Sequence, residues 1–242
     1  PVMIHDHQKV MRGEYAPERY TFRVINKEER VIYVEGNFRR LEEKNEVVGI
    51  LGVLRDVTEK IKLEKELLEL SITDGLTGLY NRRIFSEKLH QEVARRTRNG
   101  RPLSLIMLDI DHFKLFNDNF GHQEGDTVLK ELALVIKGQC RYTTTDTCCR
   151  YGGEEFAVIL TECELAVALR VAERIRSAVE GNIFSVKRHH PATTVTVSIG
   201  VATLSGNTTL GPEELIAKAD EALYRSKHGG RNRVSYGEPE TT

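Results

Sequence analysis

The order of predicted elements over residues 82–236 constrains the fold more than any other feature of the sequence. Continuous apolar runs such as LSLIMLDI are typical of core strands, and the segments between these runs predict helices. The predicted strands cover 103–110, 194–203 and 232–236, a hairpin covers 147–160, and helices cover 82–98, 125–138, 164–179 and 212–227. The central order strand-helix-strand-strand-helix-strand is that of a split βαβ, ferredoxin-like sheet. We therefore predict an α+β fold in which helices flank one sheet and further elements extend its edges.

The first 58 residues predict a separate, smaller sheet. Residues 20–25 and 31–38 alternate in polarity and 47–54 is a continuous apolar run, which together indicate a three-strand antiparallel meander. A sheet of fewer than about 60 residues buries too little surface to be stable alone. We therefore expect its covering partner to lie upstream of this sequence or on another chain.

The charged segment 58–72, TEKIKLEKELLELSI, predicts a helix with a narrow apolar stripe at Leu63, Leu67 and Leu70. Two interpretations stay open for this helix. It is a linker that lies on its own domain or, as we favour, a short parallel coiled coil that joins two copies of the chain.

Charge and cysteine usage argue against several classes of protein. Because 35 Lys and Arg face 36 Asp and Glu, no global field attracts nucleic acid or an anionic membrane. The four cysteines lack C-x-x-C spacing and the histidines lack an H-x-x-x-H pair, so we expect reduced, buried cysteines, no zinc site and a cytoplasmic protein. No run approaches the roughly 18 apolar residues of a membrane span, and no signal peptide opens the sequence. The sequence begins at Pro1 without an initiator Met, so we expect it to be part of a longer chain.

Acidic residues stand at the ends of neighbouring predicted core strands. Asp109 and Asp111 end one strand, two positions apart and so on the same face, and Glu154 and Glu155 follow a predicted turn of two glycines. One such acid is usually only solvated, but several at adjacent strand ends repel each other unless a cation lies among them. Their oxygens suit Mg²⁺ or Mn²⁺. Since alternate strand residues face opposite ways, one glutamate should meet Asp109 and the other should not. The sequence does not say whether this is Glu154 or Glu155.

Magnesium held by few carboxylates usually has phosphate oxygens in its shell. The sequence has neither a G-x-x-x-x-G-K-[ST] loop nor a G-x-G-x-x-G fingerprint, so backbone amides and separate cations would have to hold the phosphates. The turn at 112–114 can offer amides, and Lys227 and Arg231 flank the end of the last long helix. Taken alone, such cations more often only complement a helix C-terminus.

Six motifs in this order resemble those of the GGDEF domain of diguanylate cyclases. The signature itself is RYGGEEF at 150–156, and the others are DGLTGLYNRR at 74–83, DIDHFKLFND at 109–118, FGHQEGD at 120–126, SIGVA at 198–202 and ADEALYRSKHGGRN at 219–232. The resemblance covers about residues 71–236. It implies the palm-type sheet of nucleotidyl cyclases and a reaction in which two GTP condense to cyclic di-GMP and two pyrophosphates. Each half-site would bind one GTP, so the active unit would be a homodimer.

The resemblance also implies roles for individual residues. The metal ligands would be Asp109, Glu154 and the Ile110 carbonyl. Glu155 would lie near the 3′-hydroxyl and is a candidate base. The implied nucleotide ligands are Asn117 and Asp126 at the guanine edge, His122 at the nucleotide site, the backbone amides of Phe113 and Lys114, and Lys227 and Arg231 at the terminal phosphates.

One motif departs from the family. Its product-inhibition site is an R-x-x-D sequence shortly before the signature, and here that stretch is TTTD, Thr143–Asp146. A threonine cannot replace an arginine fork that grips phosphate and guanine. We expect weak or absent feedback inhibition, with Arg141 as a partial substitute.

Residues 1–58 resemble the C-terminal part of a PAS sensor domain and end in RDVTE at 55–59. The expected organisation is this PAS part, a signalling helix at 59–72, the GGDEF domain at 73–236 and a tail at 237–242. Three alternatives to a cyclase stay open: a silent receptor for GTP or cyclic di-GMP, an enzyme that makes a mixed cyclic GMP-AMP, and an interaction module with an inert partner domain. The intact acidic residues and Asp126 favour the cyclase.

Overall fold

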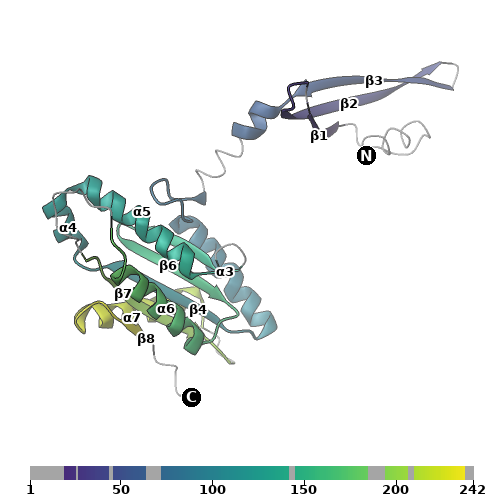
Figure 1. The fold of residues 1–242 in the computed structure, drawn as a ribbon. Helices are drawn as coiled ribbons and strands as arrows, with labels where there is room; N and C mark the ends of the chain where they lie inside the picture. Colours follow the sequence, from purple (N-terminus) through teal and green to yellow (C-terminus); the bar gives the residue numbers. More distant parts are fainter. Residues whose placement is uncertain are drawn as a thin grey trace. The chain divides into compact units, whose positions relative to one another are not determined.

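The computed structural model describes residues 19–25, 27–43, 46–63, 72–141, 145–184, 194–206 and 210–237. The chain divides into two compact units, Pro1–Ser71 and Ile72–Thr242, each with its own sheet (Figure 1). Within the described ranges, every helix is too short or too polar to cross a membrane.

The N-terminal unit has three antiparallel strands in the order β1-β2-β3: β1 (Arg19–Ile25), β2 (Val31–Glu43) and β3 (Glu46–Asp56). The predicted meander is therefore confirmed, although β2 continues to Glu43 rather than ending at residue 38. Along β3 apolar side chains are exposed on both faces, Leu51 and Val53 on one face and Leu54 on the other. This exposure agrees with the expectation that the sheet needs a covering partner.

After β3 the chain turns back onto its own sheet. The Val57 N–H donates to the Tyr33 carbonyl (2.9 Å), and the Tyr33 N–H donates to the Thr58 hydroxyl (2.8 Å). Residues 58–63 are helical, and Leu63, the first residue of the predicted apolar stripe, is exposed. Leu67 and Leu70 lie outside the described residues, so the coiled coil stays a prediction.

The C-terminal unit is built on a five-stranded sheet in the order β5-β6-β4-β7-β8. Neighbouring strands are antiparallel, except that β8 pairs parallel to β7. This is the predicted ferredoxin-like order with one strand added at an edge. The elements are α3 (Arg82–Asn99), β4 (Leu103–Ile110), α4 (Phe113–Phe120), α5 (His122–Gln139), β5 (Thr147–Gly152), β6 (Glu155–Thr161), α6 (Leu165–Glu180), β7 (Val197–Leu204), α7 (Pro212–His228) and β8 (Val234–Tyr236).

Both faces of the sheet are covered, because all eight residues of the central strand β4 are buried. Strand side chains alternate between faces. Ile106 and Leu108 therefore pack with residues of α5 and α6, whereas Leu105 and Met107 pack with residues of α3 and α7. The site residues at the end of β4 therefore extend from a strand that is buried along its whole length.

Helix α7 lies unusually close to β7. A Cβ added at Gly200 would lie 2.2 Å from the Ala219 carbonyl oxygen and 2.2 Å from the Leu223 nitrogen. Near the end of the helix, the buried Ser226 hydroxyl donates to the Ile199 carbonyl (2.7 Å). The last turn of α7, which carries Lys227, is therefore fixed against the sheet.

One helix was missed by the prediction, and some predicted bounds were wrong. Helix α4 (Phe113–Phe120) was not predicted, and α5 begins at His122 rather than residue 125. The Asn and Asp residues of FKLFNDNF favour turns and caps over helix interiors, which hides the helix in the sequence. Strand β7 begins at Val197 rather than residue 194.

The turn before β6 also differs from the prediction. The turn of the hairpin is Gly153-Glu154, not Gly152-Gly153, because Gly152 pairs with Glu155. A register shift between Arg150 and Gly152 moves the turn by one residue. Gly153 has a φ of 51°, which favours glycine. Glu154 consequently lies in the turn, and Glu155 is the first residue of β6.

Candidate active site

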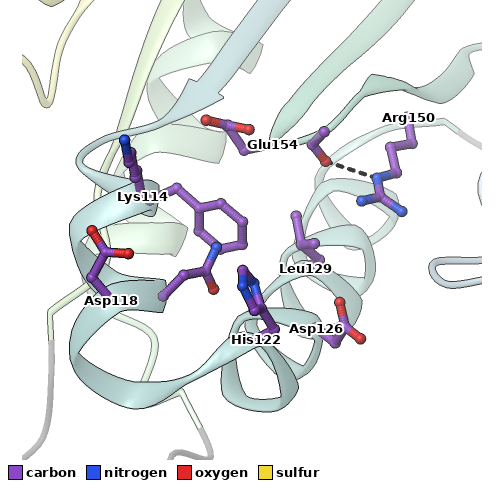
Figure 2. Close-up of a pocket in the computed structure, with 10 residues that line it drawn as sticks. Lys114, Asp118, His122, Asp126, Leu129, Arg150 and Glu154 are labelled. Carbon is purple, nitrogen blue, oxygen red and sulfur yellow. Dashed lines mark hydrogen bonds between the residues drawn. The ribbon is translucent and has the colours of Figure 1, made fainter.

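A pocket of about 310 Å³ opens between α4, α5 and the β5-β6 turn (Figure 2). It is lined by Phe113, Lys114, Asn117, Asp118, His122, Asp126, Leu129, Arg150, Gly153 and Glu154. Six of the residues implied at the nucleotide and metal sites therefore lie around one cavity: Phe113, Lys114, Asn117, His122, Asp126 and Glu154. Asp118, Leu129 and Arg150 were not predicted there.

One buried polar atom without a partner among the described residues lies at the α4-α5 end of this pocket. The Asn117 Oδ1 atom is buried and accepts no hydrogen bond from the described residues. Such an atom is costly to bury unless a ligand donates to it. Gly125 keeps the space open, since a Cβ there would lie 1.9 Å from Asn117 Oδ1. With Asp126 and His122 nearby (Figure 2), this end can bind a flat ligand that presents N–H donors.

The acidic residues gather where β4 and β6 meet. Asp109 is only 8% exposed and stands directly opposite Glu155 in the strand register. Lys227 Nζ lies 2.7 Å from Asp109 Oδ2. Burial raises the pKa of Asp109 above its ordinary value, Lys227 lowers it, and the charges of Glu154 and Glu155 raise it further. The pKa of Asp220 on α7 is also raised, by burial and then by Glu155.

The sequence left open which glutamate meets Asp109. The register places Glu155 opposite Asp109 on the face of the sheet covered by α3 and α7, whereas Glu154 lines the pocket between α4, α5 and the β5-β6 turn (Figure 2). Both charges still act on Asp109. The two glutamates thus occupy different positions around one carboxylate.

The acidic residues where β4 and β6 meet suit a divalent cation only if a bound ligand supplies further oxygen atoms. Among the described residues, no three His, Cys, Asp or Glu side chains are grouped closely enough to hold a metal ion by themselves. Asp109 and Glu154 supply hard oxygen donors, which Mg²⁺ and Mn²⁺ prefer. Phosphate oxygens would have to complete the shell.

Asp111 does not belong to this acidic group. Its Oδ1 accepts from the Ser198 hydroxyl (2.6 Å), and its Oδ2 accepts from the Thr196 hydroxyl (2.8 Å) and the Asn232 N–H (3.0 Å). The hypothesis that Asp109 and Asp111 act together was therefore wrong, because Asp111 lies in the turn after β4 and joins that turn to β7 and to the segment before β8.

An arginine that the sequence did not single out holds the β5-β6 turn. Arg150 Nη1 donates to both oxygens of Asp74 (3.2 Å each), and Arg150 Nε donates to the Gly153 carbonyl (2.9 Å; Figure 2). Burial alone would raise the pKa of Asp74, but hydrogen bonds from Thr77 and Arg150 bring it below the ordinary value. Both residues stand inside motifs, which was the only signal in the sequence.

The two residues expected at the terminal phosphates, Lys227 and Arg231, have different surroundings at the end of α7. Lys227 is engaged with Asp109, whereas Arg231 is exposed and follows the helix in a turn. Lys114 stands in the first turn of α4 and lines the pocket (Figure 2).

At the expected inhibition site, Arg141 and Asp146 bind each other. The Asp146 carboxylate, 2% exposed, accepts from Arg141 Nη2 (2.8 Å), Arg141 Nε (3.2 Å) and the Arg141 N–H (2.7 Å). The hydrogen bond to Asp146 raises the pKa of Arg141. Thr143 lies outside the described residues. Arg141 therefore binds the motif aspartate within the protein.

Comparison with known proteins decides the family. The model of the diguanylate cyclase GGDEF domain matches residues 71–233. The chain belongs to the GGDEF family. The predicted resemblance is thereby confirmed, and the pocket and the acidic strand ends described above are those of a GGDEF domain.

Relatives and solved structures agree with this assignment. The chain is 48% identical over 167 residues to the response regulator PleD of Caulobacter vibrioides, covering 69% of this chain and 36% of PleD. The diguanylate cyclase DgcP of Pseudomonas aeruginosa is 39% identical over 201 residues, covering 80% of this chain and 29% of DgcP. The chain thus spans about a third of these relatives. The structure of the coiled coil and GGDEF domain of DgcB from Caulobacter crescentus, in complex with c-di-GMP, aligns with a TM-score of 0.69 at 35% identity, covering 74% of this chain and 93% of that one.

Proposed function

We propose that the GGDEF domain is a diguanylate cyclase. In each of two successive steps, the 3′-hydroxyl oxygen of one guanosine nucleotide bonds to the α-phosphorus of the other, and pyrophosphate leaves. The hydroxyl proton passes to a base or to solvent, and the product of both steps is cyclic di-GMP. The observation that carries this proposal is the pocket itself, with the unpartnered Asn117 Oδ1 at one end and Glu154 at the other.

Different residues would bind different parts of the nucleotide. Guanine N1–H and N2–H₂ would donate to Asn117 Oδ1 and Asp126, a pattern that adenine does not present. The backbone amides at the start of α4, Phe113 and Lys114, would face phosphate oxygens. Lys227 and Arg231 would neutralise the terminal phosphates, which leave as pyrophosphate.

A divalent cation, Mg²⁺ or Mn²⁺, would be held by Asp109, Glu154 and the Ile110 carbonyl, and would neutralise triphosphate charge and polarise the attacked phosphorus. Glu155 stands opposite Asp109 and is the proposed base for the 3′-hydroxyl, because a carboxylate at this place can accept the hydroxyl proton.

The reaction requires two GTP, so two domains must face each other as a homodimer. We propose that residues 1–58, as the C-terminal part of a PAS domain, and the helix at 59–72 hold the two copies together. The similar DgcB structure contains a coiled coil next to its GGDEF domain, which supports this arrangement. A similar structure, the diguanylate cyclase SiaD of Pseudomonas aeruginosa, is in complex with its activator SiaC, so regulation by a partner is open to this chain too.

The decisive experiment incubates the protein with GTP, ATP and MgCl₂ and identifies the product by mass spectrometry. A cyclase yields cyclic di-GMP from GTP alone. A receptor binds nucleotide without turnover, and an enzyme of mixed specificity yields cyclic GMP-AMP, so both alternatives would be visible in the same samples.

Replacing Asp126 with alanine should relax the choice of base. Loss of one acceptor for the guanine N–H groups should raise KM for GTP by roughly tenfold to a hundredfold, while Glu154 and Asp109 stay in place. Steady-state rates with GTP and with ATP check this. Asp118→Ala, at an exposed neighbouring position of the pocket, is the matched control; equal effects of the two changes would contradict the role of Asp126.

The protein should also lack tight feedback inhibition. Thr143 cannot supply the arginine fork, and Asp146 is already bound by Arg141. We expect cyclic di-GMP at micromolar concentration to leave the initial rate unchanged in the wild type and in Asp146→Asn. Tight binding of cyclic di-GMP in calorimetry that disappears in Asp146→Asn would show that the site still works.

A further inference from the structure

The segment that follows α7 has an uncommon backbone. Gly230, Arg231 and Asn232 have φ angles of 113°, 62° and 45°, so two consecutive residues other than glycine lie in the left-handed region. Residues other than glycine rarely adopt this backbone conformation, so surrounding contacts must hold it. This turn carries Arg231, the residue that the proposed function places at the terminal phosphates.

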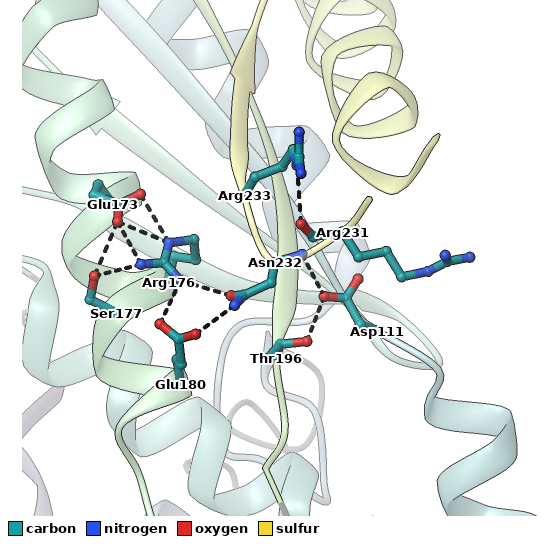
Figure 3. Close-up of polar contacts among 9 residues, drawn as sticks. All are labelled: Asp111, Glu173, Arg176, Ser177, Glu180, Thr196, Arg231, Asn232 and Arg233. Atoms are coloured by element: carbon teal, nitrogen blue, oxygen red, sulfur yellow. Dashed lines mark hydrogen bonds and ion pairs between the residues drawn. The ribbon is translucent and has the colours of Figure 1, made fainter. Parts of the chain in front are cut away.

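Asn232 is held on three sides (Figure 3). Its N–H donates to Asp111 Oδ2 (3.0 Å), its side-chain Nδ2 donates to Glu180 Oε1 (2.7 Å), and its Oδ1 accepts from Arg176 Nη1 (2.8 Å). The segment is therefore tied to the turn after β4 through the Asn232 backbone and to α6 through the Asn232 side chain.

Arg176 is the centre of the contacts on α6. Its side chain is 14% exposed, and besides Asn232 it donates to Glu180 Oε2 (2.8 Å) and to both oxygens of Glu173 (2.9 and 3.0 Å from Nε). Hydrogen bonds to Glu173 and then to Glu180 raise the pKa of this guanidinium, so it stays charged. A guanidinium bound on several edges is a rigid anchor for the Asn232 amide.

Arg231 itself is left available. Figure 3 shows its side chain extending from the turn in the direction away from Arg176. Only its backbone is engaged in the structure as described: the carbonyl accepts from Arg233 Nε (3.1 Å) and the N–H donates to the Ser226 carbonyl (3.0 Å). The guanidinium has no hydrogen bond or ion pair to any described residue. The backbone of Arg231 is therefore held by the protein, while its guanidinium extends away from the turn (Figure 3).

We propose that Arg176 is a positioning residue for the binding of the terminal phosphates. Through Asn232 it holds the left-handed turn and so directs Arg231 towards the anion, although Arg176 itself touches no substrate. This inference rests on the proposed function, because it needs Arg231 to meet the triphosphate.

The test compares Arg176→Gln, Asn232→Gly and Arg170→Gln with the wild type, each confirmed as folded by its melting curve. Asn232→Gly keeps the N–H to Asp111, suits a positive φ and leaves no buried charge without a partner. For the first two variants we expect KM for GTP to rise about tenfold with kcat within about twofold of wild type, as for loss of one charged phosphate contact. Arg170, exposed on the same helix, should change neither value.

Two further readouts separate positioning from general damage. In an Arg231→Gln background, Arg176→Gln should raise KM no further, because both changes remove the same contact. Calorimetry should show weaker GTP binding by Arg176→Gln but unchanged GMP binding. Additive effects on KM, or equal loss of GTP and GMP affinity, would overturn the positioning role. If the wild type binds GTP more tightly than Arg176→Gln does, yet forms no cyclic di-GMP, only the proposed cyclase activity would be refuted.

Discussion

Replacing Glu154 with glutamine should lower the rate of cyclic di-GMP formation by about a thousandfold, because the charge of a proposed metal ligand and its share of transition-state stabilisation would be lost. Glutamine keeps the size of the side chain. Glu154 lies in the β5-β6 turn at the rim of the pocket, and the turn is held by Arg150 through the Gly153 carbonyl rather than by Glu154. The fold should therefore stay intact while chemistry stops.

Single-turnover and steady-state assays with Mg²⁺ and GTP check this expectation, together with circular dichroism of the variant. Glu164→Gln is the matched control, since Glu164 is an exposed glutamate before α6 whose side chain caps no helix. Product formation by Glu154→Gln at the wild-type rate would sink the proposed mechanism.

Replacing Gly200 with alanine should destabilise the domain by about 3 kcal/mol or more. The added Cβ would meet the Ala219 carbonyl oxygen and the Leu223 nitrogen, each at 2.2 Å. These are backbone atoms in the middle of α7, so no side-chain rotation relieves the clash. The helix would have to move off β7 and would carry Lys227 away from Asp109.

Urea denaturation of the wild type and the variant measures the loss. Gly138→Ala is the matched control, because Gly138 lies in α5 and a Cβ added there would meet nothing within 4 Å apart from the neighbouring backbone of its own helix, so alanine should stabilise by about 0.5–1 kcal/mol. Equal melting of Gly200→Ala and wild type would show that α7 and β7 are not rigidly packed.

The sheet was predictable because its strands carry long apolar runs. The run at 103–110 gave β4 with its observed bounds, and the glycine pair at 229–230 marked the end of α7. Helix α4 was not predictable, since FKLFNDNF pairs apolar spacing with residues that prefer turns. The N-terminal meander was predictable as strands, but its relation to a PAS domain stays a prediction.

The chemical types in the site were predictable, whereas their division of labour was not. A one-residue shift of the turn decides that Glu155 faces Asp109 and that Glu154 lines the pocket. Such register choices depend on pairing across strands rather than on local sequence. The bond between Arg150 and Asp74 joins residues 76 positions apart, and no periodicity reports a contact of that kind.

The ion pair between Lys227 and Asp109 affects the charge of the site before a nucleotide binds. A buried carboxylate without a counter-ion would burden the folded state, but here the protein brings its own cation to within 2.7 Å. On our proposal, loading the site is an exchange: the lysine releases the aspartate and turns to the triphosphate as the nucleotide arrives with its cation. Before loading, the Asp109 carboxylate thus has a counter-ion that the protein itself supplies.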